Sequence, residues 1–271
     1  MIFASIPSPP FDKFDIGPLT IHIYGITMGL AVALGWWLTV GRYEKFGGVR
    51  AVAERAMFWA VVIGFTGARL AYVSTHWYRF TDDWLGVVKI WEGGIAMFGG
   101  LTAGTLAALW VVRRAGGSFP MIGDAVAIGL PAAQAIGRWG NYFNQELFGT
   151  PTALPWGLEI DPVNRPEQYA NAATFHPTFL YESLWSIATV FVLLWVERRF
   201  HLRRGSLLLC YLIAYGTIRF LLELLRTDTS FRFLGLSRNG WVSLAVVLGA
   251  SAWLVWRERR RVPEVAEPAT P

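Results

Sequence analysis

The amino-acid sequence predicts an all-α polytopic membrane protein with about seven transmembrane helices and a small periplasmic head. Hydrophobic residues make up 54% of the 271 residues and charged residues only 16%, whereas an average soluble domain is about 25% charged. Apolar runs near the length of about 20 residues that a spanning helix needs recur along the chain. Basic residues gather between alternate pairs of these runs. This composition excludes a disordered chain and a nucleic-acid partner bound on a solvated basic face.

Seven apolar stretches predict one transmembrane domain over residues 1–256. Transmembrane β-strands would instead alternate in polarity over about 10 residues, and these stretches do not. The first stretch follows an N-terminus without a basic region, so we expect it to stay in the mature protein rather than to be cleaved. The predicted spans are 19–40, 56–74, 93–112, 120–137, 178–196, 205–225 and 240–256.

The distribution of lysine and arginine predicts the orientation, because short cytoplasmic loops are enriched in these residues. Most of the 24 lysines and arginines follow the first, third and fifth spans or lie in the tail 257–271. We therefore expect a cytoplasmic tail, an N-terminus outside and a periplasmic loop or head at 138–177. The residues that set this bias are Arg42, Lys45, Arg50, Arg55, Arg113, Arg114, Arg198, Arg199, Arg203, Arg204, Arg257, Arg259, Arg260 and Arg261.

A second group of arginines lies at the predicted outer ends of the spans, where the orientation rule disfavours them. One explanation is that each side chain extends along the apolar surface to reach the outer headgroups. The other is a shared pocket that binds an anion. The group consists of Arg69, Arg138, Arg219, Arg226, Arg232 and Arg238.

Four polar residues of the sixth span share one helix face. Tyr215, Arg219, Glu223 and Arg226 are separated by four, four and three positions, a spacing that aligns side chains on a helix. A charge at the centre of a membrane costs on the order of 3 kcal/mol, so such residues usually face a protein interior or a wet cavity. Arg219 and Glu223 alone would form a self-neutralising pair, in which case Arg226 adds surplus positive charge.

The segment 137–149 after the fourth span is rich in hydrogen-bonding side chains between aromatic residues. Arg138, Asn141 and Gln145 would share a face if the helix continues through them. An aromatic belt at the interface would not need these amides or the carboxylate of Glu146. A guanidinium surrounded by amides suits a phosphate headgroup and its hydroxyls.

Several motifs together resemble one family. The segment 137–149 reads G-R-x-G-N-x-x-N-x-E-x-x-G, and the sixth span reads Y-x-x-x-R-x-x-x-E-x-x-R. Both are similar to motifs of prolipoprotein diacylglyceryl transferase. Further matches occur in the family's order at 22–25 (H-x-Y-G), 67–70, 91–94 with the glycine pair 99–100, and 176–182 (H-P-T-x-x-Y-E). The resemblance runs from about residue 19 to residue 256.

The resemblance implies an enzyme of the bacterial inner membrane. Such enzymes transfer the diacylglyceryl group of phosphatidylglycerol to the lipobox cysteine thiol of a prolipoprotein, beside its signal peptide, and release glycerol phosphate. No set of histidines, aspartates and glutamates has the spacing of metal ligands, so we expect neither a metal nor a cofactor. The implied catalytic residues are Tyr24, Arg138, Asn141, Arg219 and Glu223. The implied substrate-binding residues are Arg138, Asn144, Glu146, Gly149, Tyr215, Arg226 and Arg69.

One position departs from the family pattern. A histidine that has been regarded as catalytic often precedes the second glycine pair, and Phe98 stands there in this sequence. Either that histidine is not the general base in this branch, another group does its work, or this copy is impaired. A thiol with a pKa near 8.5 is about 3% thiolate at pH 7, so a positive pocket that raises this share could make a base dispensable.

Two other functions fit the same sequence features. A polytopic anion transporter would also need interior arginines, although the halves of the chain show no internal repeat. A catalytically silent relative that binds lipid or lipoprotein is suggested by Phe98. In the transferase interpretation the nucleophile comes from the substrate, and Cys210, in the sixth span, is a small buried apolar residue.

Overall fold

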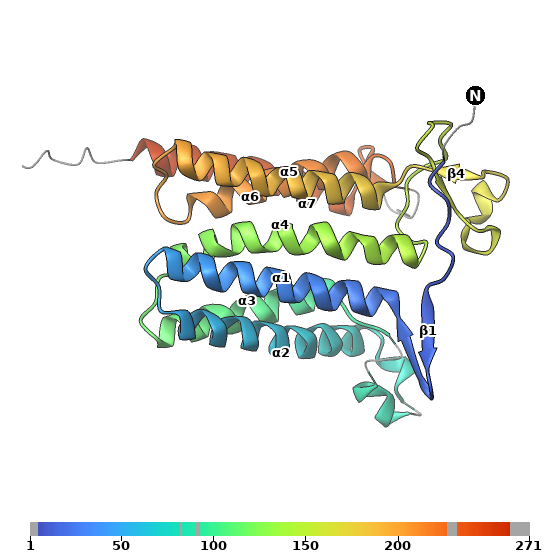
Figure 1. Ribbon diagram of the computed structural model, residues 1–271, viewed down its shortest axis with the longest axis horizontal. Coiled ribbons are helices and arrows are strands. Elements are labelled where there is room, and N and C mark those ends of the chain that lie inside the picture. The colour runs from blue at the N-terminus through green and yellow to red at the C-terminus, as the bar shows by residue number, and fades with distance from the viewer. Residues whose placement is uncertain (1–4, 82, 90–92, 227–231, 261–271) are drawn as a thin grey trace, which may run out of the picture. The chain divides into compact units, whose positions relative to one another are not determined.

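The structure is a computed structural model that describes residues 5–81, 83–89, 93–226 and 232–260 (Figure 1). Its contacts divide the chain into two units. The first unit comprises residues 1–35 and 127–271, and the second comprises residues 36–126. The helices α1 and α4 each contribute to both units. We describe each unit by itself.

Seven α-helices within the described residues account for most of the chain, which confirms the predicted fold class. Six of the seven, all except α3, are long and apolar enough to cross a membrane. The helices are α1 (Ile23–Lys45), α2 (Arg50–Thr75), α3 (Met97–Arg114), α4 (Phe119–Phe143), α5 (Thr178–Arg199), α6 (Ser206–Glu223) and α7 (Arg238–Arg259). Three antiparallel pairs of short strands join β1 (Lys13–Ile16) to β2 (Leu19–His22), β3 (Leu158–Glu159) to β4 (Thr174–Phe175), and β5 (Arg232–Phe233) to β6 (Leu236–Ser237).

Two predicted spans begin too early. The residues Leu19–His22 are not membrane helix but strand β2, which pairs with β1 through a turn at Gly17 with φ of 60°. In the third span, Gly93 and Gly94 have φ values of 86° and 77°, which are left-handed values that a right-handed helix cannot contain. The helix α3 therefore begins only at Met97.

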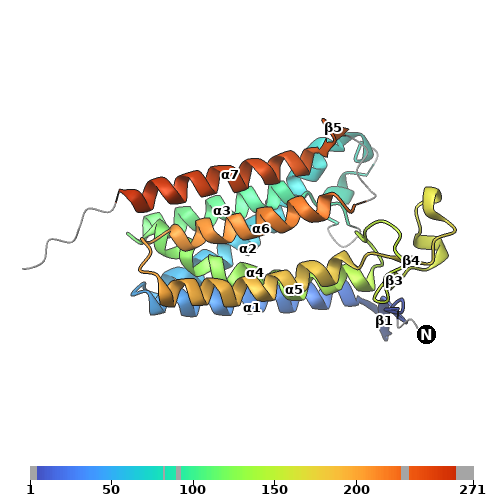
Figure 2. The same ribbon diagram turned by 90° about the horizontal axis from the view of Figure 1, so that it is seen from above.

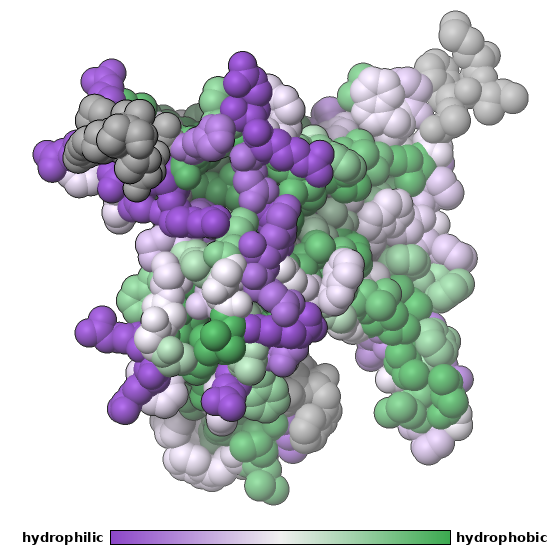
Figure 3. Space-filling model, turned by 60° about the vertical axis from the view of Figure 1, so that its left-hand side comes forward, coloured by the Kyte–Doolittle hydropathy of each residue, from purple (hydrophilic) through white to green (hydrophobic). Residues whose placement is uncertain are grey.

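The flanks of the helices expose large apolar side chains, as a chain surrounded by lipid should. Trp37, Leu106 and Phe191 are each more than 60% exposed. Figure 3 shows hydrophilic residues gathered on the near side and hydrophobic residues along the surface behind them. A soluble protein rarely exposes so much apolar surface, whereas helices that face lipid tails normally do.

In the first unit, α6 lies between α5 and α7 (Figures 1 and 2). Two hydrogen bonds connect α5 to its neighbours. Ser183 Oγ donates to Ala135 O on α4 at 2.7 Å, and Trp185 Nε1 donates to Ala214 O on α6 at 3.0 Å. Such hydrogen bonds stabilise contacts between helices where no water competes for the same groups. They fix α4, α5 and α6 side by side, and these helices carry most of the residues of the candidate site.

In the second unit, α2 and α3 approach closely through glycines. A Cβ atom at Gly104 would lie 2.7 Å from the Ala60 carbonyl oxygen, and one at Gly99 would lie 2.7 Å from the Gly67 carbonyl oxygen. Small residues at such positions let helix backbones pack closely within a membrane. The glycine pair that sequence comparison singles out at 99–100 therefore has a packing role.

We expect Gly104→Ala to lower stability by about 1–3 kcal/mol, because the added methyl group meets backbone that cannot move aside easily. Gly41 on α1 provides the matched control, since a Cβ there would meet nothing within 4 Å. Gly41→Ala should be neutral or stabilising, because alanine is the better helix former. Thermal unfolding in detergent measures both changes, and equal effects of the two substitutions would contradict the packing role.

Candidate active site

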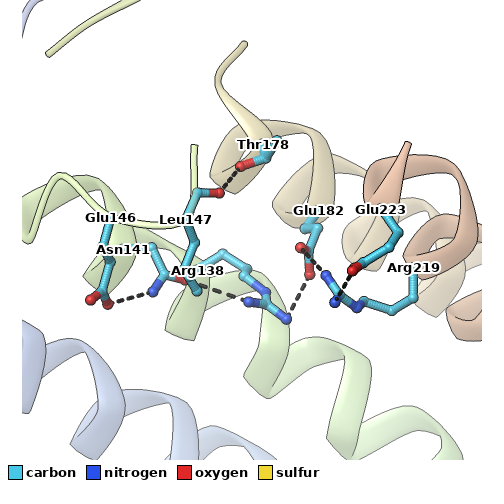
Figure 4. A network of polar contacts seen from close by, with 8 residues as sticks. All are labelled: Arg138, Asn141, Glu146, Leu147, Thr178, Glu182, Arg219 and Glu223. Atoms are coloured by element: carbon cyan, nitrogen blue, oxygen red, sulfur yellow. Dashed lines mark hydrogen bonds and ion pairs between the residues drawn. The ribbon is translucent and has the colours of Figure 1, made fainter. Parts of the chain in front are cut away.

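A chain of alternating charges joins α4, α5 and α6 (Figure 4). At its centre, Glu182 on α5 contacts two guanidinium groups. Arg138 Nη2 on α4 lies 2.6 Å from Glu182 Oε2, and Arg219 Nη1 on α6 lies 3.5 Å from Glu182 Oε1. Arg219 Nη2 also contacts Glu223 Oε2 at 3.0 Å. The two arginines predicted to form a common site are thus brought together by one shared carboxylate.

Hydrogen bonds extend this chain at both ends. Ser237, which caps α7, donates from Oγ to Glu223 Oε1 at 2.7 Å. At the other end, Asn141 Nδ2 donates to Glu146 Oε1 at 2.8 Å, and the Asn141 carbonyl group Oδ1 lies 3.5 Å from Arg138 Nη1. Glu146 is exposed, so this end of the chain opens to the surface.

The charges at the centre are buried and balanced. Glu182 and Glu223 are 5% and 3% exposed, and the side chains of Arg138 and Arg219 are 21% and 14% exposed. Two guanidinium groups and two carboxylates give these four residues no net charge, which makes their burial tolerable. The contacts described account for only two of the five N–H groups of each arginine. Both arginines therefore retain donors for an anionic ligand.

Glu182 is a residue of the network whose role the sequence does not reveal. It closes the H-P-T-x-x-Y-E motif, but it was not among the predicted catalytic or binding residues. A carboxylate near the start of an apolar span was the available signal, because an ionisable residue within a membrane usually has a partner and a function. Its two partners come from helices distant in sequence, so spacing along the chain could not identify them.

The helix α4 ends within the signature segment, which corrects one prediction. Gln145 and Leu147 have φ values of 49° and 58°, so the helix does not continue and Gln145 does not share a face with Arg138. Instead Gln145 Nε2 donates to Asp161 Oδ2 at 2.7 Å, and Asp161 N donates to Gln145 Oε1 at 2.8 Å. The hydrogen bond from Gln145 holds the pKa of the Asp161 carboxyl below its usual range. The turn also brings Glu146 back to Asn141.

Gly149 lies where three segments meet. Its N–H donates to His176 O at 3.0 Å, and the next N–H, of Thr150, donates to Leu225 O at 2.7 Å. The backbones of Gly149 and Arg226 pair directly. A Cβ at Gly149 would lie 2.8 Å from His176 Cβ, so a larger residue cannot fit without movement. This position joins the signature segment to the end of α6.

Two predicted tyrosines pack against neighbouring helices or side chains. Tyr24 on α1 lies against Gly140, the residue that precedes Asn141. A Cβ added at Gly140 would come within 2.7 Å of the Tyr24 ring. Tyr215 stacks on Tyr211 at 5.9 Å between ring centroids and packs beside the apolar cluster of α4, α5 and α6. Asn144, which is exposed, points its amide toward Glu146 at 3.5 Å. The roles assigned to these residues stay predictions.

Arg69, in the second unit, differs from the other arginines. Its guanidinium donates to five carbonyl oxygens, those of Gly86, Val87, Lys89, Gly93 and Gly94. These contacts use all five N–H groups in this structure. They tie Arg69 to the backbone before α3, and its predicted contact with substrate stays a prediction. Phe98, in the first turn of α3, is 57% exposed. The motif residues 91 and 92 and the side chain of Arg232 lie outside the described residues.

His176 belongs to a small polar cluster at the start of α5. Its Nδ1 lies 3.2 Å from the Tyr181 hydroxyl group, which accepts a hydrogen bond from Trp156 Nε1 at 3.0 Å. Burial lowers the pKa of the His176 imidazole below its ordinary value.

This shift predicts a pH dependence of stability. The unfolded chain binds a proton at His176 at a higher pH than the folded chain does. The stabilisation is therefore complete above about pH 6.5 and is lost as the pH falls through that value toward the lowered folded pKa. We expect His176→Gln to flatten the dependence of the melting temperature on pH between 7.5 and 5.5. An unchanged slope in that variant would contradict the contribution of His176.

The fold and the site together define a class of protein. This is a polytopic membrane protein in which helices α4, α5 and α6 bury a neutral network of arginines and glutamates with donors left over for an anion. A family model described as prolipoprotein diacylglyceryl transferase matches residues 12–256.

Named relatives agree with this match over most of their length. The chain is 42% identical over 258 residues to phosphatidylglycerol–prolipoprotein diacylglyceryl transferase 2 of Streptomyces coelicolor, covering 94% of this chain and 81% of that protein. It is 43% identical to the phosphatidylglycerol–prolipoprotein diacylglyceryl transferase of Cutibacterium acnes, covering 94% and 88%. It is 40% identical to that of Paenarthrobacter aurescens, covering 97% and 87%. The chain belongs to the prolipoprotein diacylglyceryl transferase family, which confirms the resemblance seen in its motifs.

Proposed function

We propose that this protein transfers the diacylglyceryl group of phosphatidylglycerol to the lipobox cysteine of prolipoproteins, the first step of bacterial lipoprotein maturation. The substrate sulfur forms a bond to the glyceryl carbon, and the bond from that carbon to the phosphate oxygen breaks. The products are a thioether-linked preprotein and glycerol phosphate. The observation that carries this proposal is the Arg138–Glu182–Arg219 bridge in a chain that matches the family from residue 12 to 256.

The two arginines stabilise the departing phosphate. Negative charge grows on the phosphate oxygens as the carbon–oxygen bond breaks, and positioned guanidinium groups lower the free energy of that state. Arg138 and Arg219 have N–H groups to offer because Glu182 engages only one nitrogen of each. Their planar forks match phosphate oxygens in pairs. Glu182 and Glu223 hold the forks in place and keep the resting site neutral.

The exposed end of the network suits the glycerol headgroup. Asn141, Asn144 and Glu146 offer amide and carboxylate groups that hydrogen-bond to hydroxyls. Tyr24 lies beside this end, against Gly140, where its hydroxyl group would reach the ester or the thiol. The backbone of Gly149 pairs with that of Arg226, which follows α6, so the end of α6 borders the same region.

The nucleophile comes from the preprotein. Cys210, the one cysteine of this chain, packs on α6 beside the cluster of apolar residues that includes Leu207 and Tyr211. The thiol of the substrate needs to lose its proton, and a positive surrounding raises the thiolate share. Because a larger thiolate share lessens the need for a general base, the reaction can proceed with Phe98 at a position where the family often has histidine.

The protein is proposed to lie in the bacterial inner membrane with its N-terminus outside and its C-terminus in the cytoplasm. The basic residues at the ends of α1, α3, α5 and α7 support this orientation. The signature segment 137–149 then faces the periplasm, on the side where a preprotein has its lipobox cysteine.

Transfer by the purified protein in detergent tests the proposal. We expect a lipobox peptide to gain a diacylglyceryl group only when phosphatidylglycerol is supplied. A transporter or a silent binding relative would leave the peptide unmodified. The natural chain and its Phe98→His variant are then introduced separately into a transferase-depleted strain. The natural chain, with Phe98, should restore growth. If only Phe98→His restored growth, the natural chain would be the silent relative.

A further inference from the structure

The arginines at one end of the second unit differ in how their charge is neutralised. Arg50, at the start of α2, lies 2.8 Å from Glu54 and 3.1 Å from Glu44. One turn later on α2, Arg55 is exposed, and Arg114 at the end of α3 is exposed as well. Within the described residues neither of them has a carboxylate partner. Arg114 instead lies over the ring of Trp110, 5.4 Å from its centroid.

These two arginines line a groove between α2 and α3. Its volume is about 260 Å³. Besides Arg55 and Arg114, its walls are the indoles of Trp59 and Trp110 and the apolar side chains of Val52 and Val111. Trp59 is 43% exposed and Trp110 is 58% exposed. Two guanidinium groups thus lie at the helix ends, with two exposed indoles beside them.

We propose that this groove binds the headgroup of an anionic phospholipid, which is held there without reacting. The guanidinium groups would contact the phosphate, and Trp59, Trp110 and the valines would contact the glycerol and the first carbons of the acyl chains. Two positive charges without carboxylates favour a lipid of net negative charge over a zwitterionic one, whose own cation would be repelled. The apolar walls favour a lipid over a soluble phosphate ion.

The proposed lipid site is separate from the reaction. By the distribution of basic residues, the ends of α2 and α3 that carry Arg50, Arg55 and Arg114 belong to the predicted cytoplasmic side. The residues of the Arg138–Glu182–Arg219 network all belong to the other unit. Loss of the lipid site should therefore leave the rate of diacylglyceryl transfer to a lipobox peptide at the wild-type value. This transfer rate also reports that each variant is folded.

A photoactivatable anionic phospholipid tests the site. The full chain is placed in zwitterionic lipid nanodiscs with a low concentration of the probe, and labelled peptides are mapped by mass spectrometry. We expect labelling of the segments 52–59 and 110–115. Each arginine near a membrane surface contributes about fivefold to the binding of an anionic lipid, so Arg55→Gln with Arg114→Gln should reduce labelling roughly 25-fold.

Two control variants, a zwitterionic probe and one competitor complete the test. The charge-preserving pair Arg55→Lys with Arg114→Lys should keep most of the labelling, and Arg50→Gln, which removes an arginine that already has partners, should leave it intact. Unchanged labelling in the double glutamine variant would overturn the proposal. So would equal labelling of these segments by a zwitterionic probe, or loss of labelling when inorganic phosphate is added at constant ionic strength.

Discussion

Replacement of Arg138 by alanine is expected to reduce transfer to a lipobox peptide by about 10²–10³-fold, the usual effect of removing one donor that stabilises a developing negative charge. The side chain is also a partner of Glu182, so its loss leaves that buried carboxylate with Arg219 alone. The rate of peptide labelling with purified phosphatidylglycerol measures the effect.

Arg198 offers the matched control for this substitution. It is an exposed arginine at the far end of α5, so Arg198→Ala removes the same charge without touching the network. We expect that variant to label peptide at the wild-type rate. If Arg138→Ala retained the wild-type rate while inserting and accumulating normally, Arg138 would have no part in stabilising the phosphate.

Glu182→Gln should have the second large effect, although no sequence motif assigned Glu182 a role. The amide keeps the shape of the side chain but cannot hold two guanidinium groups by charge. Removing one partner from a buried ion-pair network typically costs about 3–5 kcal/mol of stability. We expect a lower melting temperature together with slower transfer, because both arginines lose the group that positions them.

Glu167→Gln is the control for Glu182→Gln, because Glu167 is an exposed carboxylate in the loop between α4 and α5. It should change neither the melting temperature nor the transfer rate. A Glu182→Gln protein with wild-type melting temperature and transfer rate would show that the ion pairs to Arg138 and Arg219 contribute neither to stability nor to catalysis.

Long apolar helices were predictable because length and hydropathy limit where they can occur, and six of the described helices are long and apolar enough to cross a membrane. The observed helix ends differ from the predicted ones where the local backbone conformation breaks a helix that the apolar composition would allow. The apolar residues of β2 turn back on β1 at Gly17, and the left-handed backbone at Gly93 and Gly94 delays α3. The left-handed backbone at Gln145 ends α4, although its neighbours would continue a helical face. None of these conformations has a periodic signal in the sequence.

The candidate site was predictable in its residue types but not in its connections. The motifs pointed to Arg138, Asn141, Arg219 and Glu223, and the structure links them through contacts. Glu182, the residue that joins two of them, could not be found by spacing because α4, α5 and α6 meet only after folding. Arg69 shows the converse, since an arginine in a family-like motif gives all of its donors to backbone carbonyls.

A double-substitution cycle between Arg138 and Arg219 tests most directly whether the two arginines act as one unit on the departing phosphate. The conservative variants Arg138→Lys and Arg219→Lys keep the charge but lose the planar fork, so measurable transfer should remain. Comparison of kcat/KM for the single and double variants should show a coupling free energy of at least about 0.5 kcal/mol, as for residues that share a partner. If the two effects instead add to within about 0.3 kcal/mol, as they do for independent sites, the two arginines do not hold one phosphate together.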